Sequence, residues 1–339
     1  MNKKIIFRAD GDSRTGLGHL YRLFALAEMF RTEFDFLFVT RESSVLKVIP
    51  KDYRVNLIPK SIEINEEPEW LFFNFPPEHH IIVADGYQFV SYYQKKIKQF
   101  NFTLVYVDDM LSEHMYADLV INHSPHAKIE NYNNESYTQF ALGTDFAILR
   151  PIFLKKSHKE KKEKFPNNAL ICFGGSDSNN FTLKAVKEIL KVDEINSINV
   201  VVGAAYEFKE IYELEKQNLR VNVFKNLDEE NLFRLMNTST FAIAPTSTVL
   251  FELISVNTYI LAGYSVENQK MAYHHFDENN VFKGLGDFNN FDFSTLKDIL
   301  ANISFKDRER QIEFQKRLID GNQKDRFLKL IYKLNFNGS

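Results

Sequence analysis

Short apolar runs that do not alternate with polar residues constrain the fold of this chain more than any other sequence feature. Ile81-Ile82-Val83-Ala84 is one such run, and Ile5-Ile6-Phe7 is another. Strands that are apolar on both faces need cover on both sides, which is typical of the parallel sheets of α/β folds. In the first half of the chain we therefore predict strands at 4–9, 34–40, 54–59, 81–85, 103–108 and 118–122, and helices at 19–31, 43–49 and 91–100.

A charged segment divides this pattern into two halves. Residues 155–164, KKSHKEKKEK, contain almost nothing to bury, as is typical of a solvated linker. A length of 339 residues also suits two domains. After the linker we predict strands at 168–173, 197–203, 220–225, 241–244 and 258–262, helices at 179–192, 206–217, 228–239, 247–257 and 267–280, and a helical tail at 306–334 that is broken near Asp320-Gly321-Asn322.

Composition excludes several kinds of partner. The net charge is −3 and the pI is near 6.3, so no broad positive field attracts nucleic acid or an anionic membrane. The N-terminal segment MNKKIIFRAD has too few apolar residues for a signal peptide, and no window is long and apolar enough for a membrane span. Cys172 is the single cysteine, which excludes an internal disulfide and suits a reducing compartment. We therefore expect a cytoplasmic protein without a nucleic-acid or membrane partner.

The segment 5–19, IIFRADGDSRTGLGH, predicts a phosphate-binding turn. An apolar strand runs into a loop that carries Gly16 and Gly18, and His19 stands at the start of the following apolar-periodic helix. The amides and the positive dipole of a helix start favour anions and disfavour an imidazolium ion, so His19 is suited to act as a general base. The alternative is a purely structural histidine at the helix start. The segment also departs from the dinucleotide fingerprint GxGxxG, since Tyr21 occupies its third glycine position.

Polar and glycine-rich sequences follow most of the predicted strands. In open parallel sheets, ligands bind at the carboxyl ends of the strands, and two facing sheets place the site in a cleft between domains. Each sequence has a plainer alternative, because Asp, Ser and Thr also cap turns and helix starts. The sequences are Asp85-Gly86-Tyr87, Asp108-Asp109, Gly174-Gly175-Ser176-Asp177, Gly203-Ala204-Ala205, Thr246-Ser247-Thr248 with Glu252, and Glu267-Asn268-Gln269.

Two of these sequences suit a nucleotide. Gly174-Gly175-Ser176 precedes a predicted helix and therefore fits an anion site. Thr246-Ser247-Thr248 offers hydroxyls and amides to a diphosphate. Glu252, about one turn into the same helix, is placed to accept both hydroxyls of a ribose.

Histidine spacing does not favour a metal site. Adjacent pairs such as His79-His80 diverge on regular elements. His123 and His126 are separated by a proline and have no cysteine nearby, so a surface or core role is expected for each. We expect neither a metal nor a cofactor.

The order of these motifs resembles the UDP-2,4-diacetamido-2,4,6-trideoxy-β-L-altropyranose hydrolases of pseudaminic acid biosynthesis, a family related to the GT-B glycosyltransferases. The similarity spans nearly the whole chain. It rests on FRADGDSRTGLGHLYRLFALA, VADGY, VYVDD, LGTDFAILRPIF, CFGGSDSNN and VVVGAAY, and on Glu252 followed by Glu267-Asn268-Gln269. The resemblance implies a GT-B-like α/β fold, in which two Rossmann-like domains with parallel sheets, 1–154 and 168–305, face each other across a cleft. It also implies a linker at 155–167 and a helical segment at 306–339 that returns to the first domain.

The resemblance further implies a reaction at the anomeric carbon of a UDP-linked amino sugar. Water attacks this carbon, and UDP is the leaving group. The catalytic histidine of the family falls on His19, and its active-site tyrosine falls on Tyr87. The first loop, with Asp10, Gly16 and Gly18, would border the sugar and the diphosphate.

In the second domain, the resemblance assigns the ribose to Glu252 and the diphosphate and sugar to Glu267-Asn268-Gln269. One departure stands close to these residues. Relatives carry a glycine pair before the ribose glutamate, in a pattern like GAGGSTSWE, whereas this chain has Thr246-Ser247. Glycine lets backbone amides approach a phosphate, so these side chains either block that approach or replace amides with hydroxyls.

Three functions stay open at this point. The first is a nucleotide-sugar hydrolase with a small-molecule substrate; the oligomeric state stays open, and a monomer is compatible with the sequence. The second is a GT-B glycosyltransferase, in which an acceptor hydroxyl replaces water. The third, motivated by the lost glycines, is a catalytically inactive nucleotide-sugar-binding protein. Release of free sugar without an acceptor distinguishes the first from the second, and UDP binding without turnover would indicate the third.

Overall fold

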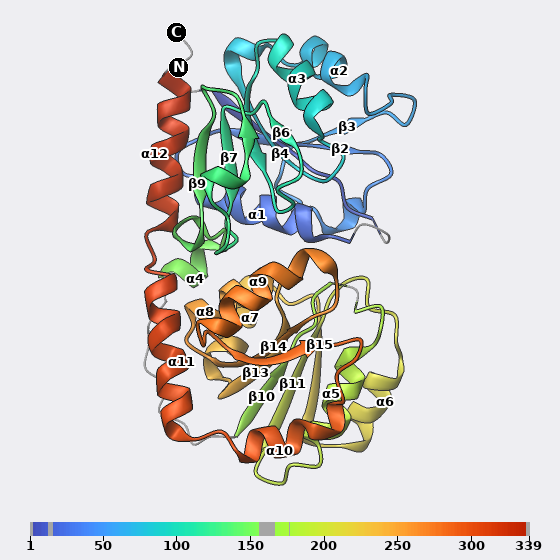
Figure 1. Ribbon diagram of the computed structural model, residues 1–339. Helices are drawn as coiled ribbons and strands as arrows, with labels where there is room; N and C mark the ends of the chain where they lie inside the picture. The colour runs from blue at the N-terminus through green and yellow to red at the C-terminus, as the bar shows by residue number, and fades with distance from the viewer. Residues whose placement is uncertain (1–2, 13–15, 156–166, 176, 337–339) are drawn as a thin grey trace. The chain divides into compact units, whose positions relative to one another are not determined.

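The computed structural model describes residues 3–12, 16–155, 167–175 and 177–336. The chain divides into two compact units, Met1–Pro151 with Asn322–Ser339, and Ile152–Gly321. Each unit contains its own parallel sheet with helices beside it (Figure 1). The charged segment predicted as a linker lies almost entirely outside the described residues.

The first unit is built on a seven-stranded parallel sheet. Its two central strands pair in register, with Ile6 opposite Ile82 and Phe7 opposite Val83, and all four side chains are fully buried. The apolar runs are therefore strands covered on both faces, as predicted. From edge to edge the strands are β3 (Val55–Ile58), β2 (Phe36–Arg41), β1 (Lys4–Arg8), β4 (His80–Asp85), β5 (Thr103–Val107), β7 (Leu119–Asn122) and β9 (Gln139–Leu142).

Helices connect these strands. The helix predicted at 43–49 is wrong, because only a 3-10 turn, Leu46–Val48, forms there. Pro50 disfavours the helical conformation of the residue before it, and Ile49 is accordingly extended, with φ −72° and ψ 131°. The remaining elements of the first half are α1 (Gly18–Phe30), α2 (Glu67–Asn74), α3 (Ser91–Gln99), α4 (Pro151–Lys155), the pair β6 (His114–Met115) and β8 (Asn133–Asn134), and 3-10 turns at Pro77–His79, Ile129–Asn131 and Thr144–Phe146.

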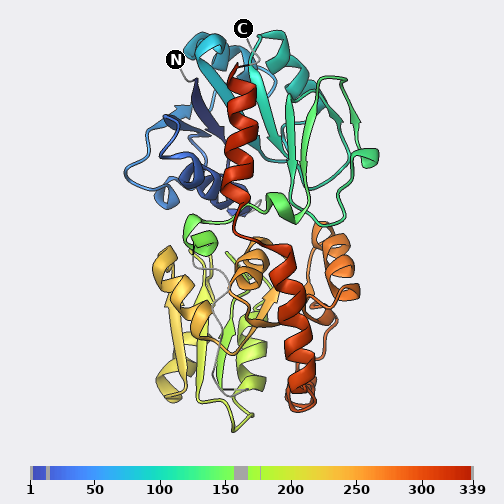
Figure 2. The same cartoon turned by 90° about the vertical axis from the view of Figure 1, so that its left-hand side faces the viewer.

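The C-terminal helix α12 (Gln323–Phe336) belongs to the first unit. The predicted break in the helical tail is present, and Gly321 there has a positive φ of 83°. Phe327 is fully buried, and its ring lies 6.4 Å from that of Phe30 on α1 and 5.6 Å from that of Phe146. Figure 2 shows α12 along the side of this unit. Phe146, the last residue of the motif LGTDF, therefore forms part of the surface on which α12 packs.

The second unit is built on a six-stranded parallel sheet. Its strands are β12 (Val221–Lys225), β11 (Ser197–Val202), β10 (Asn168–Ile171), β13 (Phe241–Pro245), β14 (Tyr259–Tyr264) and β15 (Lys283–Asp287). The sequence missed β15, because its two glycines are untypical of strands. The helices are α5 (Phe181–Ile189), α6 (Glu210–Gln217), α7 (Glu229–Thr238), α8 (Thr248–Ser255), α9 (Glu267–Glu278), α10 (Leu296–Ala301) and α11 (Phe305–Leu318), with a 3-10 turn at Phe293–Thr295.

Both sheets have a topological switch point. In the first, the chain adds β2 and β3 on one side of β1, and then β4 and the later strands on the other. In the second, β11 and β12 lie on one side of β10, and β13 to β15 on the other. In open α/β sheets, ligands bind at the carboxyl ends of the strands beside such a point. Ligand-binding residues are therefore expected at the carboxyl ends of β1 and β4, and of β10 and β13.

Candidate active site

His19 and Asp85 meet at the switch point of the first sheet. His19 is the second residue of α1, which follows β1, and Asp85 is the last residue of β4. His19 Nδ1 lies 2.7 Å from Asp85 Oδ1, and Asp85 is fully buried. Tyr87, two residues further on, contacts the imidazole edge to face, with 4.7 Å between ring centroids. The structure thus brings together the two residues predicted to carry out catalysis.

Arg22 completes this cluster from the next turn of α1. Its guanidinium binds both carboxylate oxygens of Asp85, with Nε to Oδ2 and Nη2 to Oδ1 both at 2.6 Å. Its Nη1 donates to Asp109 Oδ2 at 3.0 Å. Arg22 was not among the predicted site residues, although the sequence carries a signal for it: residues three apart on a helix share a face, and a buried arginine requires an anionic partner.

The carboxylate determines which nitrogen of His19 carries the proton. Burial alone would raise the pKa of Asp85, but the charge of Arg22 outweighs burial and, together with His19, lowers that pKa. Asp85 is therefore an ionised acceptor at neutral pH, and His19 Nδ1 is the donor in their hydrogen bond. In the neutral imidazole this arrangement leaves the lone pair on Nε2, where it can accept a proton.

His123 lies at the end of β7 in the same sheet. Its side chain is buried, and burial, followed by the charge of Arg22, lowers its pKa to about 3. The Ile148 amide donates to His123 Nδ1 at 3.2 Å. His123 is therefore a neutral histidine in the core, as the sequence indicated.

The carboxylate of Asp10, in the first loop, is occupied by hydrogen bonds within the protein. Its carboxylate accepts two hydrogen bonds from Arg8, at 2.7 and 2.8 Å, and one from the Arg41 amide at 2.8 Å. Thr40 and Gln88 add further donors. Burial acts to raise the pKa of Asp10, but Arg8 outweighs it and the pKa falls to about 2. Asp10 therefore holds the loop in place, which limits its availability to a sugar.

The start of α1 has no side-chain cap among the described residues. Leu17 occupies the N-cap position without a side-chain hydrogen bond, and the first turn has no acidic residue. Gly16 has a φ of 79°, which favours glycine. A β-carbon on Gly18 would meet nothing within 4 Å among the described atoms, so internal packing does not explain this glycine.

The second switch point lies at the start of α8, after β13. Thr246 is buried there, and its amide and hydroxyl both donate to the Gly263 carbonyl, at 2.8 and 3.1 Å. Its side chain therefore points into the unit, away from the helix start. Ser247 is the N-cap of α8 and makes no side-chain capping bond, and Thr248 begins the helix.

In the loop after β10, a carboxylate of the loop itself binds the first amides of the following helix. Asp177 accepts hydrogen bonds from the Phe181 and Thr182 amides, at 2.9 and 2.8 Å, so the first turn of α5 is already capped. Among the described atoms, a β-carbon on Gly174 or Gly175 would meet nothing within 4 Å, and Gly174 has a φ of 87°. Any anion here would contact the glycine loop and not the first amides of α5. Ser176, predicted for this site, lies outside the described residues.

The remaining predicted residues differ in exposure. Glu252 is buried on α8, in the second turn of that helix. Glu267 and Asn268 are exposed at the start of α9, and Glu267 pairs with Lys270 at 3.6 Å. Gln269 Oε1 accepts from the Ser265 amide at 3.1 Å and thereby caps the turn that precedes α9. These three residues follow β14, the neighbour of β13.

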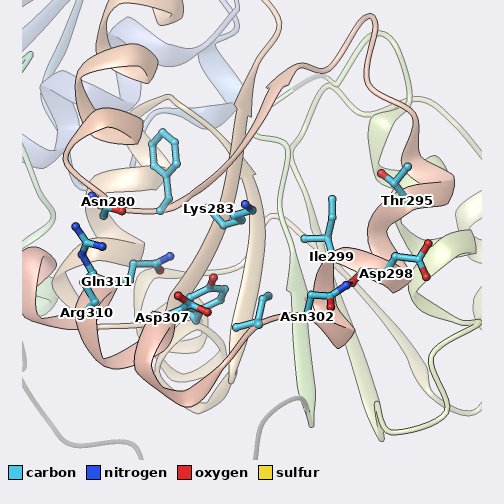
Figure 3. A pocket seen from close by; sticks show the side chains of 12 residues that line it. Asn280, Lys283, Thr295, Asp298, Ile299, Asn302, Asp307, Arg310 and Gln311 are labelled. Carbon is cyan, nitrogen blue, oxygen red and sulfur yellow. The ribbon is translucent and has the colours of Figure 1, made fainter.

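A cavity of about 510 Å³ in the second unit lies at the opposite end of the sheet (Figure 3). Its lining includes Tyr259 and Lys283, the first residues of β14 and β15, together with Arg310 of α11. It contains none of the predicted site residues. Among the described residues, no group of three or more His, Cys, Asp or Glu is arranged to hold a metal ion. None of the described helices combines the length and hydrophobicity that a membrane span requires.

Comparisons with known sequences reveal two distant relatives. No protein-family model matches the chain. An uncharacterized protein of Methanocaldococcus jannaschii is 27% identical over 289 residues, which cover 80% of this chain and 57% of that protein. The chain thus spans little more than half the length of this relative. The UDP-2,4-diacetamido-2,4,6-trideoxy-beta-L-altropyranose hydrolase of Campylobacter jejuni is 24% identical over 271 residues, which cover 79% of this chain and 93% of the hydrolase.

Solved structures with the same architecture extend over nearly the whole chain. Acinetobacter baumannii MurG superimposes with a TM-score of 0.66 at 10% identity, covering 98% of this chain and 99% of MurG. Arabidopsis thaliana UGT89C1, solved with UDP-L-rhamnose, superimposes with a TM-score of 0.65 at 11% identity, covering 99% of this chain and all of that structure. These similarities confirm the predicted GT-B-like α/β fold with two parallel sheets. With the sequence relatives, they support a relationship to nucleotide-sugar proteins of this fold.

Proposed function

We propose that this chain is a nucleotide-sugar hydrolase. Its substrate would be a UDP-linked 2,4-diacetamido-2,4,6-trideoxyhexose or a similar amino sugar, and its products UDP and the free sugar. The observation that carries this proposal is the 2.7 Å hydrogen bond from His19 Nδ1 to the buried Asp85, which leaves Nε2 to act as a base. The similarity to the Campylobacter jejuni hydrolase supports the choice of reaction.

The chemistry assigned to His19 is proton abstraction from water. His19 Nε2 takes a proton as the water oxygen forms a bond to the anomeric carbon, and the bond from that carbon to the phosphate oxygen breaks, with its electron pair leaving on UDP. Asp85 stabilises the imidazolium that forms, because it is ionised and hydrogen-bonded to Nδ1. Tyr87 contacts the imidazole face and is half-exposed, so we assign it to orienting the water or the sugar.

The uncapped start of α8 is the site we assign to the diphosphate, and the uncapped start of α1 is assigned to the sugar. Backbone amides at a helix start bind anions, and no side chain among the described residues caps these amides in α8. Asp228 caps α7 and Ser304 caps α11, whereas α6 and α9 also begin without a side-chain cap, so the choice of α8 rests on its place after β13 at the switch point. Among the described atoms, the space beside Gly18, Gly174 and Gly175 is open to a ligand.

The remaining assignments follow the family pattern. Glu252 on α8 would accept the ribose hydroxyls, and Glu267, Asn268 and Gln269 would border the diphosphate and sugar. The lost glycine pair is compatible with this scheme at Thr246, because that side chain is turned towards Gly263. Ser247 and Thr248, which are half-buried at the start of α8, can add hydroxyl donors.

The direct test is UDP release from UDP-linked amino sugars by the purified protein, without an added acceptor. A general base contributes about 10²–10⁴-fold to turnover, so His19→Asn should lower UDP release by that factor and leave UDP binding intact. Near wild-type turnover of this variant would refute the mechanism.

A glycosyltransferase is the second candidate, because the same base can deprotonate an acceptor hydroxyl. The structural similarity to CalG4, the calicheamicin glycosyltransferase, with a TM-score of 0.65 at 12% identity, supports this alternative. Product analysis separates the two reactions: a hydrolase yields free sugar at full rate without an acceptor, whereas a transferase requires the acceptor. Tight UDP binding without turnover of any UDP-amino sugar would instead indicate a nucleotide-sugar-binding protein.

A further inference from the structure

We infer that Arg22 is a positioning residue of the active site, which fixes Asp85 and thereby holds the proton of the His19 imidazole on Nδ1. This inference deepens the proposed function and rests on it for its catalytic meaning. Its structural content is independent, because the geometry concerns three side chains of the first unit. Arg22 itself makes no contact with substrate in this scheme.

Arg22 holds Asp85 in a fixed geometry. It donates two parallel hydrogen bonds of 2.6 Å to the Asp85 carboxylate, and its Nη1 donates to Asp109 at 3.0 Å. A bidentate guanidinium fixes the plane of a carboxylate as well as its position. Because Asp85 Oδ1 is also the acceptor for His19 Nδ1, fixing this carboxylate fixes the imidazole ring.

Charge adds a second reason. Arg22 Nη2 lies 3.2 Å from His19 Nδ1, so it places a positive charge beside the same ring. Both nitrogens are donors to Asp85 Oδ1, so they approach each other closely without a hydrogen bond between them. A fixed positive charge beside a ring disfavours a second positive charge on that ring.

The other titratable groups around the ring do not replace this effect. Tyr87 presents its ring to the imidazole, and buried His123 is neutral. Asp109 is bound to Arg22 through Nη1. Tyr106, within range of the same charges, is buried and its pKa is raised, so it stays protonated. Among the described side chains, Arg22 is the cation that contacts both His19 and Asp85.

The experiment is a pH titration of His19 by NMR in substrate-free protein labelled with ¹⁵N at histidine, with His19→Asn used to assign the signal. Wild type should show the Nδ1–H tautomer. In Arg22→Gln the positive charge is lost, so the midpoint of His19 protonation should rise by at least about one pH unit. The low-pH limb of the UDP-release profile should move upward by the same amount. Arg31→Gln is the matched control, because it removes a charge from the exposed C-cap position of α1 and should change neither readout.

Arg22→Lys separates charge from geometry and keeps the test valid if Arg22→Gln fails to fold. Lysine retains the charge but cannot bind both oxygens of Asp85, so the midpoint should stay near that of wild type while the tautomers mix and turnover falls. An unchanged midpoint in Arg22→Gln, or a wild-type tautomer and turnover in Arg22→Lys, would overturn the inference. If the NMR results are as expected but no UDP-sugar is hydrolysed, the proposed function fails and the role of Arg22 stands.

Discussion

The backbone of Gly203 lies directly against that of Gly175: a β-carbon on Gly203 would stand 2.4 Å from the Gly175 carbonyl oxygen. Gly203 follows β11 and Gly175 follows β10, so two neighbouring strand-end loops touch without intervening side chains. The other face of Gly175 is open to the described part of the chain, since its own β-carbon would meet none of those atoms within 4 Å. The two glycines therefore have different physical reasons to be glycine.

Substitution should separate these reasons. Gly203→Ala forces the loops apart and should lower the free energy of unfolding by about 1–3 kcal/mol, as overpacking does. Gly175→Ala should leave stability close to that of wild type but weaken UDP binding. Urea denaturation and UDP calorimetry on both variants provide the check. Equal stability of the two variants would show that the close contact does not constrain the loop.

Asp10 makes stability depend on pH in the acid range. Its pKa is about 2 in the folded state and 3.8 in its reference state, so the ionised form stabilises the fold. This contribution, about 2 kcal/mol at neutral pH, is present above pH 4 and is lost as the pH falls towards 2. Asp10→Asn should therefore lower stability at pH 7 by at least this amount and flatten the acid limb of the unfolding profile.

The control for Asp10 is Asp52→Asn. Asp52 also pairs with an arginine, Arg31, but on the surface. Exposed ion pairs contribute little, so this variant should behave like wild type in denaturant titrations at pH 7 and pH 3. A loss of stability similar to that of Asp10→Asn would contradict the assignment of the acid sensitivity to the buried network.

Thr246→Gly tests whether the lost glycine matters. It would restore a glycine to the position where the family pattern has one, yet the Thr246 hydroxyl is bonded to the Gly263 carbonyl and is buried. We expect a loss of about 1–2 kcal/mol in stability, from the hydrogen bond and from glycine entropy, without tighter UDP binding. Ser247→Gly, at the uncapped start of α8, should cost little stability. An increase in UDP affinity for Thr246→Gly would mean that its side chain obstructs the nucleotide.

The sequence predicted the parts of this molecule that depend on local pattern. Apolar runs located the central strands, the glycine-bearing turn before the first helix indicated His19, and the rule for strand ends indicated Asp85. Contacts between distant segments could not be predicted in this way. Arg8 on β1 pairs with Glu67 on α2, 59 residues away, and Asp85 at the end of β4 binds Arg22 on α1 and does not cap a turn. Such pairs depend on which strands and helices the sheet order brings together.

Some elements were missed for a related reason. The helix α2 and the strand β9 have mixed patterns that periodicity does not resolve. Asp177 was recognised only as part of a glycine-rich turn, whereas the structure shows its carboxylate on the first amides of α5. A side chain that occupies an anion site of its own helix is indistinguishable, in sequence, from one that flanks a ligand.

Phe327→Ala tests how firmly α12 is held. The ring is fully buried between Phe30 and Phe146, so its removal should cost about 3–5 kcal/mol. Hydrogen exchange should show early loss of protection in α12. Phe305→Ala, on the exposed first turn of α11, is the control and should leave exchange unchanged. Wild-type protection in Phe327→Ala would show that other contacts hold the helix.

Variants of Tyr87 distinguish the contact made by its ring from a function of its hydroxyl group. Tyr87→Phe keeps the edge-to-face contact with His19, so stability and the protonation of His19 should match those of wild type. If the hydroxyl orients the attacking water or the sugar, turnover should fall by about tenfold or more, which corresponds to one hydrogen bond in the transition state. Tyr87→Ala removes the ring as well and should also perturb the His19 NMR signal. Full turnover of Tyr87→Phe, together with impaired Tyr87→Ala, would restrict Tyr87 to holding the imidazole in place.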